Sequence, residues 1–140
     1  MTRNDFQVRE VQSIDLAAIW QLHNRALADT GAHAGNGDWD RDVRDPLTSY
    51  VQRGGNFLVC ELDGLVVGMG AYIPADERSV EIKRMRVDPA YQRTGIGKRI
   101  LYDLESHAKR CGFVRSILET TQQQKPAQSF YERNGYRRTR

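Results

Sequence analysis

The segment YQRTGIGKRI, from Tyr91 to Ile100, combines two glycines with three cationic side chains. Glycines allow successive backbone N–H groups to converge on an anion, and the positive end of a helix that begins there adds to the attraction. The side chains of Arg93 and Lys98 add full positive charges nearby. The segment therefore predicts a loop that binds a phosphate group.

Three known glycine loops compete for this segment, and they imply different ligands. A nucleotide-hydrolysing P-loop needs G-x-x-x-x-G-K-[ST], but Gln92 stands at its first glycine and Arg99 replaces its hydroxyl residue. A dinucleotide loop needs a third glycine where this chain has Ile100. The third pattern, [QR]-x-x-G-x-[GA], is matched in full by Gln92–Gly97. A glycine turn before a solvated surface helix is the alternative to all three.

The segments around this loop alternate between strand-like and helical patterns, which predicts a mixed α/β fold. Strands are expected at residues 6–12, 57–62, 65–74, 79–89 and 113–119, with a last one from residue 136. Helices are expected at residues 14–31, 47–55, 95–111 and 124–134, and the polar stretch 32–46 is expected to be a functional loop. Asp63-Gly64 between two apolar runs predicts a hairpin.

With this order, the chain resembles the GNAT superfamily of N-acetyltransferases. In that family the same loop follows the fourth strand, opens the main helix and holds the pyrophosphate of coenzyme A. The hairpin FLVCELDGLVVGMGAYI, the strand IKRMRVDP and the segment LETTQQQKPAQSFYERNGY are similar to family elements, so that the resemblance covers roughly residues 56–136.

The resemblance implies a GNAT fold in a single domain, residues 1–140. Its mixed central sheet is expected to be splayed between the fourth and fifth strands and flanked by helices. Only four residues follow Tyr136, so the final strand is expected to be short or missing. A second copy of the chain, in a homodimer, could complete the sheet.

The resemblance also implies which residues hold acetyl-CoA. The pyrophosphate would be bound by the loop residues Gln92, Arg93, Thr94, Gly95, Ile96, Gly97 and Lys98. The backbone of Met85, Arg86 and Val87 would position the pantetheine chain and the thioester, while the side chains of Met85 and Val87 pack in the core. Gln124, or else Ser129, could supply a further polar contact.

Tyr131 matches the family tyrosine that protonates the departing thiolate of coenzyme A. A phenol is protonated at neutral pH, and the thiolate is basic enough to take its proton. Burial of the ring on an amphipathic helix is the alternative.

Glu81 is the first candidate for the general base. It lies eleven residues before Gln92, the offset at which histone-acetyltransferase relatives carry a catalytic glutamate. The alternative is a solvated strand residue paired with Lys83. The other candidates are Glu119, Asp38 and Asp40.

The acidic loop 35–45 is a candidate for the acceptor pocket, because its aspartates could attract a cationic amine and Trp39 could pack on the carbon frame of that amine. A solvated acidic loop, with Trp39 packed at the edge of the domain, is the alternative.

Composition narrows the class of protein. The chain has 21 basic and 18 acidic residues, a net charge of +3 that is weak for a general nucleic-acid binder. Cys60 and Cys111 are far apart and are expected to be buried free thiols, and no metal site can be assembled from the scattered histidines. We find no apolar run long enough to cross a membrane and no signal-peptide core, so we expect a cytoplasmic protein.

These observations favour an acetyl-CoA-dependent N-acetyltransferase that transfers the acetyl group directly to a primary amine, because no cysteine lies in a nucleophile-type motif. A small molecule or amino acid is the preferred acceptor over a protein lysine or N-terminus. The alternatives are a transferase of longer acyl groups, a non-catalytic acyl-CoA sensor and a nucleic-acid binder.

Overall fold

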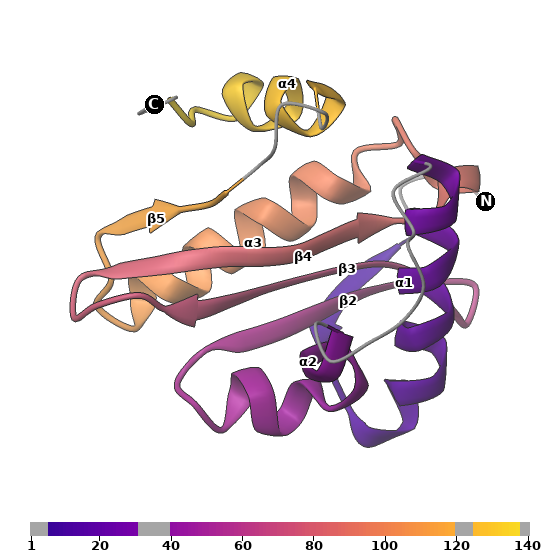
Figure 1. Ribbon diagram of the computed structural model, residues 1–140, viewed down its shortest axis with the longest axis horizontal. Coiled ribbons are helices and arrows are strands. Elements are labelled where there is room, and N and C mark those ends of the chain that lie inside the picture. Colours follow the sequence, from indigo (N-terminus) through magenta and orange to yellow (C-terminus); the bar gives the residue numbers. More distant parts are fainter. Residues whose placement is uncertain (1–5, 31–39, 120–124, 138–140) are drawn as a thin grey trace.

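The computed structural model describes residues 6–30, 40–119 and 125–137, and these residues form a mixed sheet with helices on both faces (Figure 1). The strands follow the order β1-β2-β3-β4-β5, with antiparallel pairing up to β4 and parallel pairing between β4 and β5. Their bounds are Gln7–Glu10, Asn56–Leu62, Leu65–Pro74, Ser79–Val87 and Arg115–Ile117. The fold is the one that the sequence predicts.

Two hydrophobic layers enclose the sheet, because successive side chains of a strand point to opposite faces. On β2, Leu58 and Cys60 pack with the apolar stripe of α3, Ile96–Arg110. The alternate residue Val59 packs with α1, Leu16–Thr30. Figure 1 shows α1 and α3 on opposite sides of the sheet.

The local signals of the sequence predict most elements well. Asp63 and Gly64 both have left-handed φ, +52° and +79°, and form the expected hairpin turn between β2 and β3. The helical segment 47–55 is shorter than expected, a π-helical turn at Leu47–Val51. The helix α4, Lys125–Arg133, lies in the predicted segment. The described residues after α4 form no strand up to residue 137.

Two expectations are wrong. The stretch predicted as a loop contains a short helix, α2, Arg41–Arg44, which forms where Val43 is fully buried. Cys111 is exposed rather than buried, because α3 ends at Arg110 and Cys111 becomes its C-cap. Cys60 is buried, as expected.

A β-bulge interrupts the pairing of β3 with β4. Ala71 pairs with Lys83 and Met69 pairs with Arg86, so Arg84 and Met85 together oppose Gly70. Arg84 has a φ of +59°, in the left-handed region. A Cβ at position 70 would lie 2.5 Å from Met85 Sδ, so only glycine allows Met85 to pack here.

The sheet opens between β4 and β5. The two strands pair only from Ser79 to Glu81 on β4 and from Arg115 to Ile117 on β5. Past Glu81, β4 continues for six residues without β5 beside it, and Figure 1 shows the two strands diverging toward the carboxyl end of β4. This is the predicted splay, and β5 is shorter than expected because its pairing ends here. No helix in the described part of the chain is long and apolar enough to cross a membrane.

Candidate active site

The loop after β4 is fixed at its first residue by three elements. Asp88 donates its backbone N–H to Val67 O on β3 at 2.8 Å, and its Oδ1 accepts from the N–H of Ala90 at 3.0 Å. Its Oδ2 accepts from Arg25 Nη2 of α1 at 2.9 Å. A 3-10 turn at Pro89–Tyr91 then leads into the glycine segment.

The glycine segment leaves the start of α3 open to an anion. Gly95 is the N-cap, with a left-handed φ of +88° and no side chain to cap the helix. A Cβ at Gly95 would meet no atom of the described chain within 4 Å. The first helical bond runs from Arg99 N to Gly95 O at 3.0 Å, so the N–H groups before Arg99 precede the helical ladder. These features fit the pyrophosphate of coenzyme A.

The other predicted loop residues lie around this opening. Gln92, Arg93 and Lys98 are exposed, and Arg93 has a φ of +65°. Thr94 Oγ1 donates to Tyr91 O at 2.5 Å and so closes the loop on itself. The side chain of Ile96 is buried in the core, and therefore only its backbone is available to a ligand.

The start of α3, the end of β4 and α4 meet at Gly97. A Cβ at this position would lie 3.5 Å from Val87 Cγ2 and 3.5 Å from Phe130 Cζ. The side chains of Met85 and Val87 pack against the α3 core, as predicted. The structure therefore brings the segment Met85–Val87 and the glycine loop to one end of the sheet, beside the opening between β4 and β5.

Tyr131 lies on α4 at this end of the molecule. Its ring packs on the same core and makes edge contacts with Phe130 and Tyr136, at centroid distances of 5.2 and 5.7 Å. Burial raises the pKa of its hydroxyl to about 12, and the positive charge of Arg86 opposes that rise. Tyr131 is therefore protonated at neutral pH and can act as a proton donor.

Glu81 lies on the α1 face of β4. Its β3 partner Ile73 packs against the α1 core. Glu81 is partly buried, and its carboxylate forms no hydrogen bond or ion pair with another described residue. It precedes Met85 by four residues, roughly 13 Å along an extended strand. The structure therefore does not place the carboxylate against the segment Met85–Val87.

The other predicted candidates fall in different places. Glu119 is exposed beyond the end of β5, and Ser129 is exposed on α4. Gln124, Asp38 and Trp39 lie outside the described residues. Asp40 is only 1% exposed, so burial makes it a poor base for a substrate amine.

A polar cluster, which the sequence does not predict, lies between α1, α2 and β4. Asp40 Oδ1 is 2.8 Å from His23 Nε2, and both residues are buried. Beside them, Arg84 Nε and Nη2 donate to the two oxygens of Asp42 at 2.9 and 2.8 Å. The hydroxyl of Tyr50 also donates to Asp42. His23, Asp40, Asp42, Tyr50 and Arg84 are called the polar cluster below.

The charges in the polar cluster are strongly coupled. Burial alone raises the pKa of the Asp42 carboxyl, but the hydrogen bonds from Arg84 and Tyr50 outweigh it and hold that pKa below its ordinary value. Burial lowers the pKa of His23, and the positive charges of Arg86 and Arg84 lower it further against the opposing effect of Asp40. The Nδ1 atom of His23 is buried without a partner, which suits a neutral ring with its proton on Nε2.

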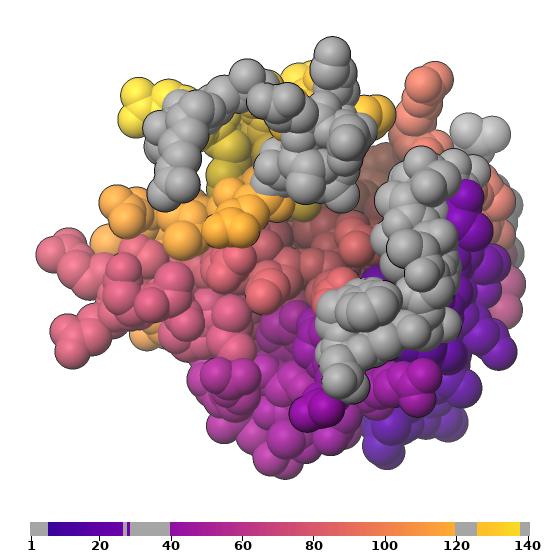
Figure 2. Space-filling model, in the orientation of Figure 1, coloured from indigo at the N-terminus to yellow at the C-terminus, as the bar shows by residue number. Residues whose placement is uncertain are grey.

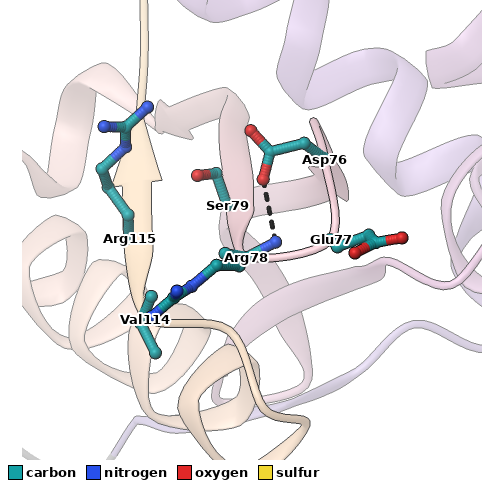
Figure 3. A pocket seen from close by; sticks show the side chains of 6 residues that line it. All are labelled: Asp76, Glu77, Arg78, Ser79, Val114 and Arg115. Carbon is teal, nitrogen blue, oxygen red and sulfur yellow. Dashed lines mark hydrogen bonds between the residues drawn. The ribbon is translucent and has the colours of Figure 1, made fainter.

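A surface cavity lies elsewhere, at the start of β4 and β5 (Figure 3). It is lined by Asp76, Glu77, Arg78, Ser79, Val114 and Arg115. Asp76 Oδ1 accepts a hydrogen bond from the Arg78 N–H at 2.8 Å beside it. This cavity is at the opposite end of β4 from the glycine loop, so it is not part of the candidate site.

Comparison with known proteins agrees with the geometry. The model of the family described as "Acetyltransferase (GNAT) family" matches residues 16–136. The chain is 32% identical over 104 residues to human N-acetyltransferase 8, covering 70% of this chain and 46% of that protein. It is 29% identical over 134 residues to the uncharacterized N-acetyltransferase YjgM of Escherichia coli (strain K12), covering 92% and 80%. The chain spans less than half the length of N-acetyltransferase 8.

Solved structures share the fold. A GNAT-family acetyltransferase from Staphylococcus aureus superposes with a TM-score of 0.90 at 22% identity, covering 96% of this chain and 86% of that one. The PaiA N-acetyltransferase of Thermoplasma acidophilum, solved with coenzyme A, gives 0.81 at 21% identity, covering 95% and 90%. The chain belongs to the GNAT family of acetyltransferases.

The buried pair of His23 and Asp40 predicts a pH-dependent stability. The unfolded chain takes up a proton on His23 near the ordinary histidine pKa of 6.5, while the folded chain resists it. As the pH is lowered below 6.5, the free energy of unfolding should therefore decrease, by up to about 1.4 kcal/mol per pH unit from this one group. His23→Gln keeps a donor near the position of Nε2 but does not titrate.

Urea unfolding from roughly pH 7.5 down to pH 5 should show a shallower acid-side decline in His23→Gln than in the wild type. His107→Gln, at a histidine on α3 across the sheet, is the matched control. Parallel declines in the wild type and His23→Gln would show that His23 is not held neutral.

Proposed function

We propose that the protein is an acetyl-CoA-dependent N-acetyltransferase that transfers the acetyl group directly to a primary amine. The observation that best supports this proposal is that the start of α3, with Gly95 as its N-cap, has no side-chain cap and lies beside the open edge of β4. Family membership supports the same activity, as does the presence of coenzyme A in the PaiA structure. The cytoplasmic location and the possible homodimer stay predictions from the sequence.

Each segment of the candidate site has a role in this proposal. Acetyl-CoA supplies an acetyl thioester, whose carbonyl carbon is attacked by the acceptor amine. The glycine loop binds its pyrophosphate through backbone N–H groups, with Arg93 and Lys98 as electrostatic helpers. The segment Met85–Val87 offers backbone groups along the edge of β4 that β5 leaves open. In this proposal, acetyl-CoA is therefore bound and oriented by backbone groups that the bulge and the splay expose.

Two proton transfers complete the reaction. Tyr131 holds a proton on its hydroxyl and donates it to the departing thiolate, for which its raised pKa keeps it ready at neutral pH. Glu81 accepts the proton of the amine. Because Glu81 is four residues from Met85 on the strand, this transfer passes through water rather than by direct contact.

The cofactor loop gives a direct test of the proposed function. Acetyl-CoA at a hundredfold excess over its Kd should raise the Tm of the wild type by about 5–10 °C. Gly95→Glu should abolish this rise, because it places a side chain and a negative charge where the pyrophosphate binds. Scanning fluorimetry with and without acetyl-CoA measures the effect.

Gly112→Glu is the matched control, because Gly112 also has a left-handed φ, +97°, with nothing within 4 Å, but lies after the other end of α3. Both variants carry the same backbone strain and charge change. A thermal rise that survives in Gly95→Glu would contradict the site.

Tyr131→Phe should lower kcat by about 100-fold, because the variant keeps the packed ring and loses the proton donor. The thermal rise with acetyl-CoA should be retained. Steady-state release of coenzyme A measures kcat, and Tyr102→Phe, at an exposed tyrosine of α3, is the control. Unchanged turnover in Tyr131→Phe would remove its assigned role.

Glu81→Gln should reduce kcat/KM most at a pH below the pKa of the acceptor amine, where a proton must be removed before attack. At higher pH the variant and the wild type should converge. The measurement is a pH profile of kcat/KM, with Glu119→Gln run beside it. If Glu119→Gln shows the pH-dependent loss and Glu81→Gln does not, the base is Glu119.

A further inference from the structure

Arg86 is a mostly buried cation on β4, and the proposed roles use its backbone but not its side chain. Its Nη1 donates to Met85 O at 3.0 Å, and its Nε is buried without a hydrogen-bond partner. No carboxylate in the described chain forms an ion pair with it. A buried N–H group without a hydrogen-bond partner is unfavourable, so the Nε of Arg86 leaves a place for an acceptor atom from outside the chain.

The nearby acids are already engaged. Asp42 accepts hydrogen bonds from Arg84 and Tyr50, and Asp40 is hydrogen-bonded to His23. Burial lowers the pKa of Arg86, and the positive charge of Arg84 lowers it further. Asp40 and Asp42 match Arg84 and Arg86 in number, but neither carboxylate forms a hydrogen bond with Arg86, whose Nε has no partner. The guanidinium of Arg86 therefore keeps an edge that an anionic group from outside the chain would bind.

The free edge of Arg86 has the geometry for a carboxylate. With Nη1 used by Met85 O, the side formed by Nε and Nη2 remains. Arg84 uses the same two atoms to hold both oxygens of Asp42, at 2.9 and 2.8 Å. Such paired hydrogen bonds match the two oxygens of a carboxylate. A phosphate dianion would leave a third oxygen and a second charge without a partner among the described residues.

The position of Arg86 indicates the molecule to which this carboxylate belongs. Met85 and Val87 point into the α3 core, so Arg86 between them points to the opposite face, where α1 and α2 lie. Its charge acts on Tyr131, across the opening between β4 and β5. In Figure 2 salmon atoms of this part of the chain lie between the orange atoms of β5 and the magenta and indigo atoms of the N-terminal half. The glycine loop that would bind the cofactor phosphates begins six residues later.

We propose that Arg86 binds a carboxylate of the acceptor, and hence that the acceptor is an amine that carries its own carboxylate, such as a free amino acid. This inference rests on the proposed function. It reverses the electrostatic expectation for the acceptor site, because the residue that selects the acceptor is a cation. Asp40 and Asp42 of the segment 35–45 belong to the polar cluster instead.

The test compares paired acceptors. Initial rates are measured for each of the free L-amino acids and for its α-carboxamide, which keeps the amine and removes the negative charge. The wild type should favour the acid over the amide by about 10- to 100-fold in kcat/KM for its best pair. Arg86→Gln should reduce this ratio to near one, mainly by raising the KM of the acid. Arg86→Lys should keep part of it, and Arg110→Gln, at the far end of α3, should leave it unchanged.

Three results would overturn the carboxylate role. The first is a wild-type ratio near or below one in every pair. The second is an equal fall of kcat for acid and amide in Arg86→Gln, which would assign Arg86 to the reaction itself. The third is a preference for 2-aminoethyl phosphate over β-alanine, which would make the group a phosphate.

The folding of each variant is checked by its thermal rise with acetyl-CoA. If Arg86→Gln does not fold, the carboxylate role of Arg86 is judged from the acid-to-amide ratio of kcat/KM in the wild type and in Arg86→Lys. Failure of the proposed function has a different signature, because then no amine in the panel is acetylated although acetyl-CoA binds. Amines acetylated without a carboxylate preference would leave the N-acetyltransferase standing and overturn only the role of Arg86.

Discussion

The paired hydrogen bonds between Arg84 and Asp42 hold β4 in the shape on which the candidate site depends. The bulge places Arg84 in the left-handed region, at a φ of +59°, which is unfavourable for a residue with a Cβ. Asp42, 42 residues earlier in the chain, holds its guanidinium at two atoms. The backbone from Met85 to Val87 follows directly, so the geometry of the segment proposed to bind the thioester depends on a short helix that is distant in sequence.

The same constraint divides the two faces of β4. On the α3 face the strand contributes apolar side chains, and Gly70 lets Met85 pack closely against the helix. On the α1 face it contributes charges: the polar cluster pairs Arg84 with Asp42, whereas Glu81 and Arg86 form no ion pair within the described residues. One strand thus combines a core surface with a charged surface, and the bulge sets where each side chain falls.

The parts of the site that the sequence predicts are those that depend on residues adjacent in the sequence. The hexamer Gln92–Gly97, the apolar stripe of α3 and the Asp63-Gly64 turn are local patterns, and each forms where expected. The polar cluster could not be predicted, because the pairing of Arg84 with Asp42 joins segments that only the tertiary fold brings together.

The burial of Asp40 and the exposure of Cys111 have the same origin. Nothing local distinguishes a solvated Asp40 from one that is buried against His23. Cys111 continues the apolar spacing of α3, but the helix ends one residue before it, and the C-cap conformation turns its side chain to solvent. Periodicity predicts the face of a helix only while the helix continues.

Asp88 shows that the glycine loop is not an independent module. One residue joins β3 through its backbone, the following turn through one carboxylate oxygen and α1 through the other. These three attachments fix the orientation of the hexamer Gln92–Gly97 that follows. Grafted onto a helix without these attachments, the same six residues would keep their composition but lose their orientation. The phosphate-binding role proposed for the loop therefore depends on the junction and not on the motif alone.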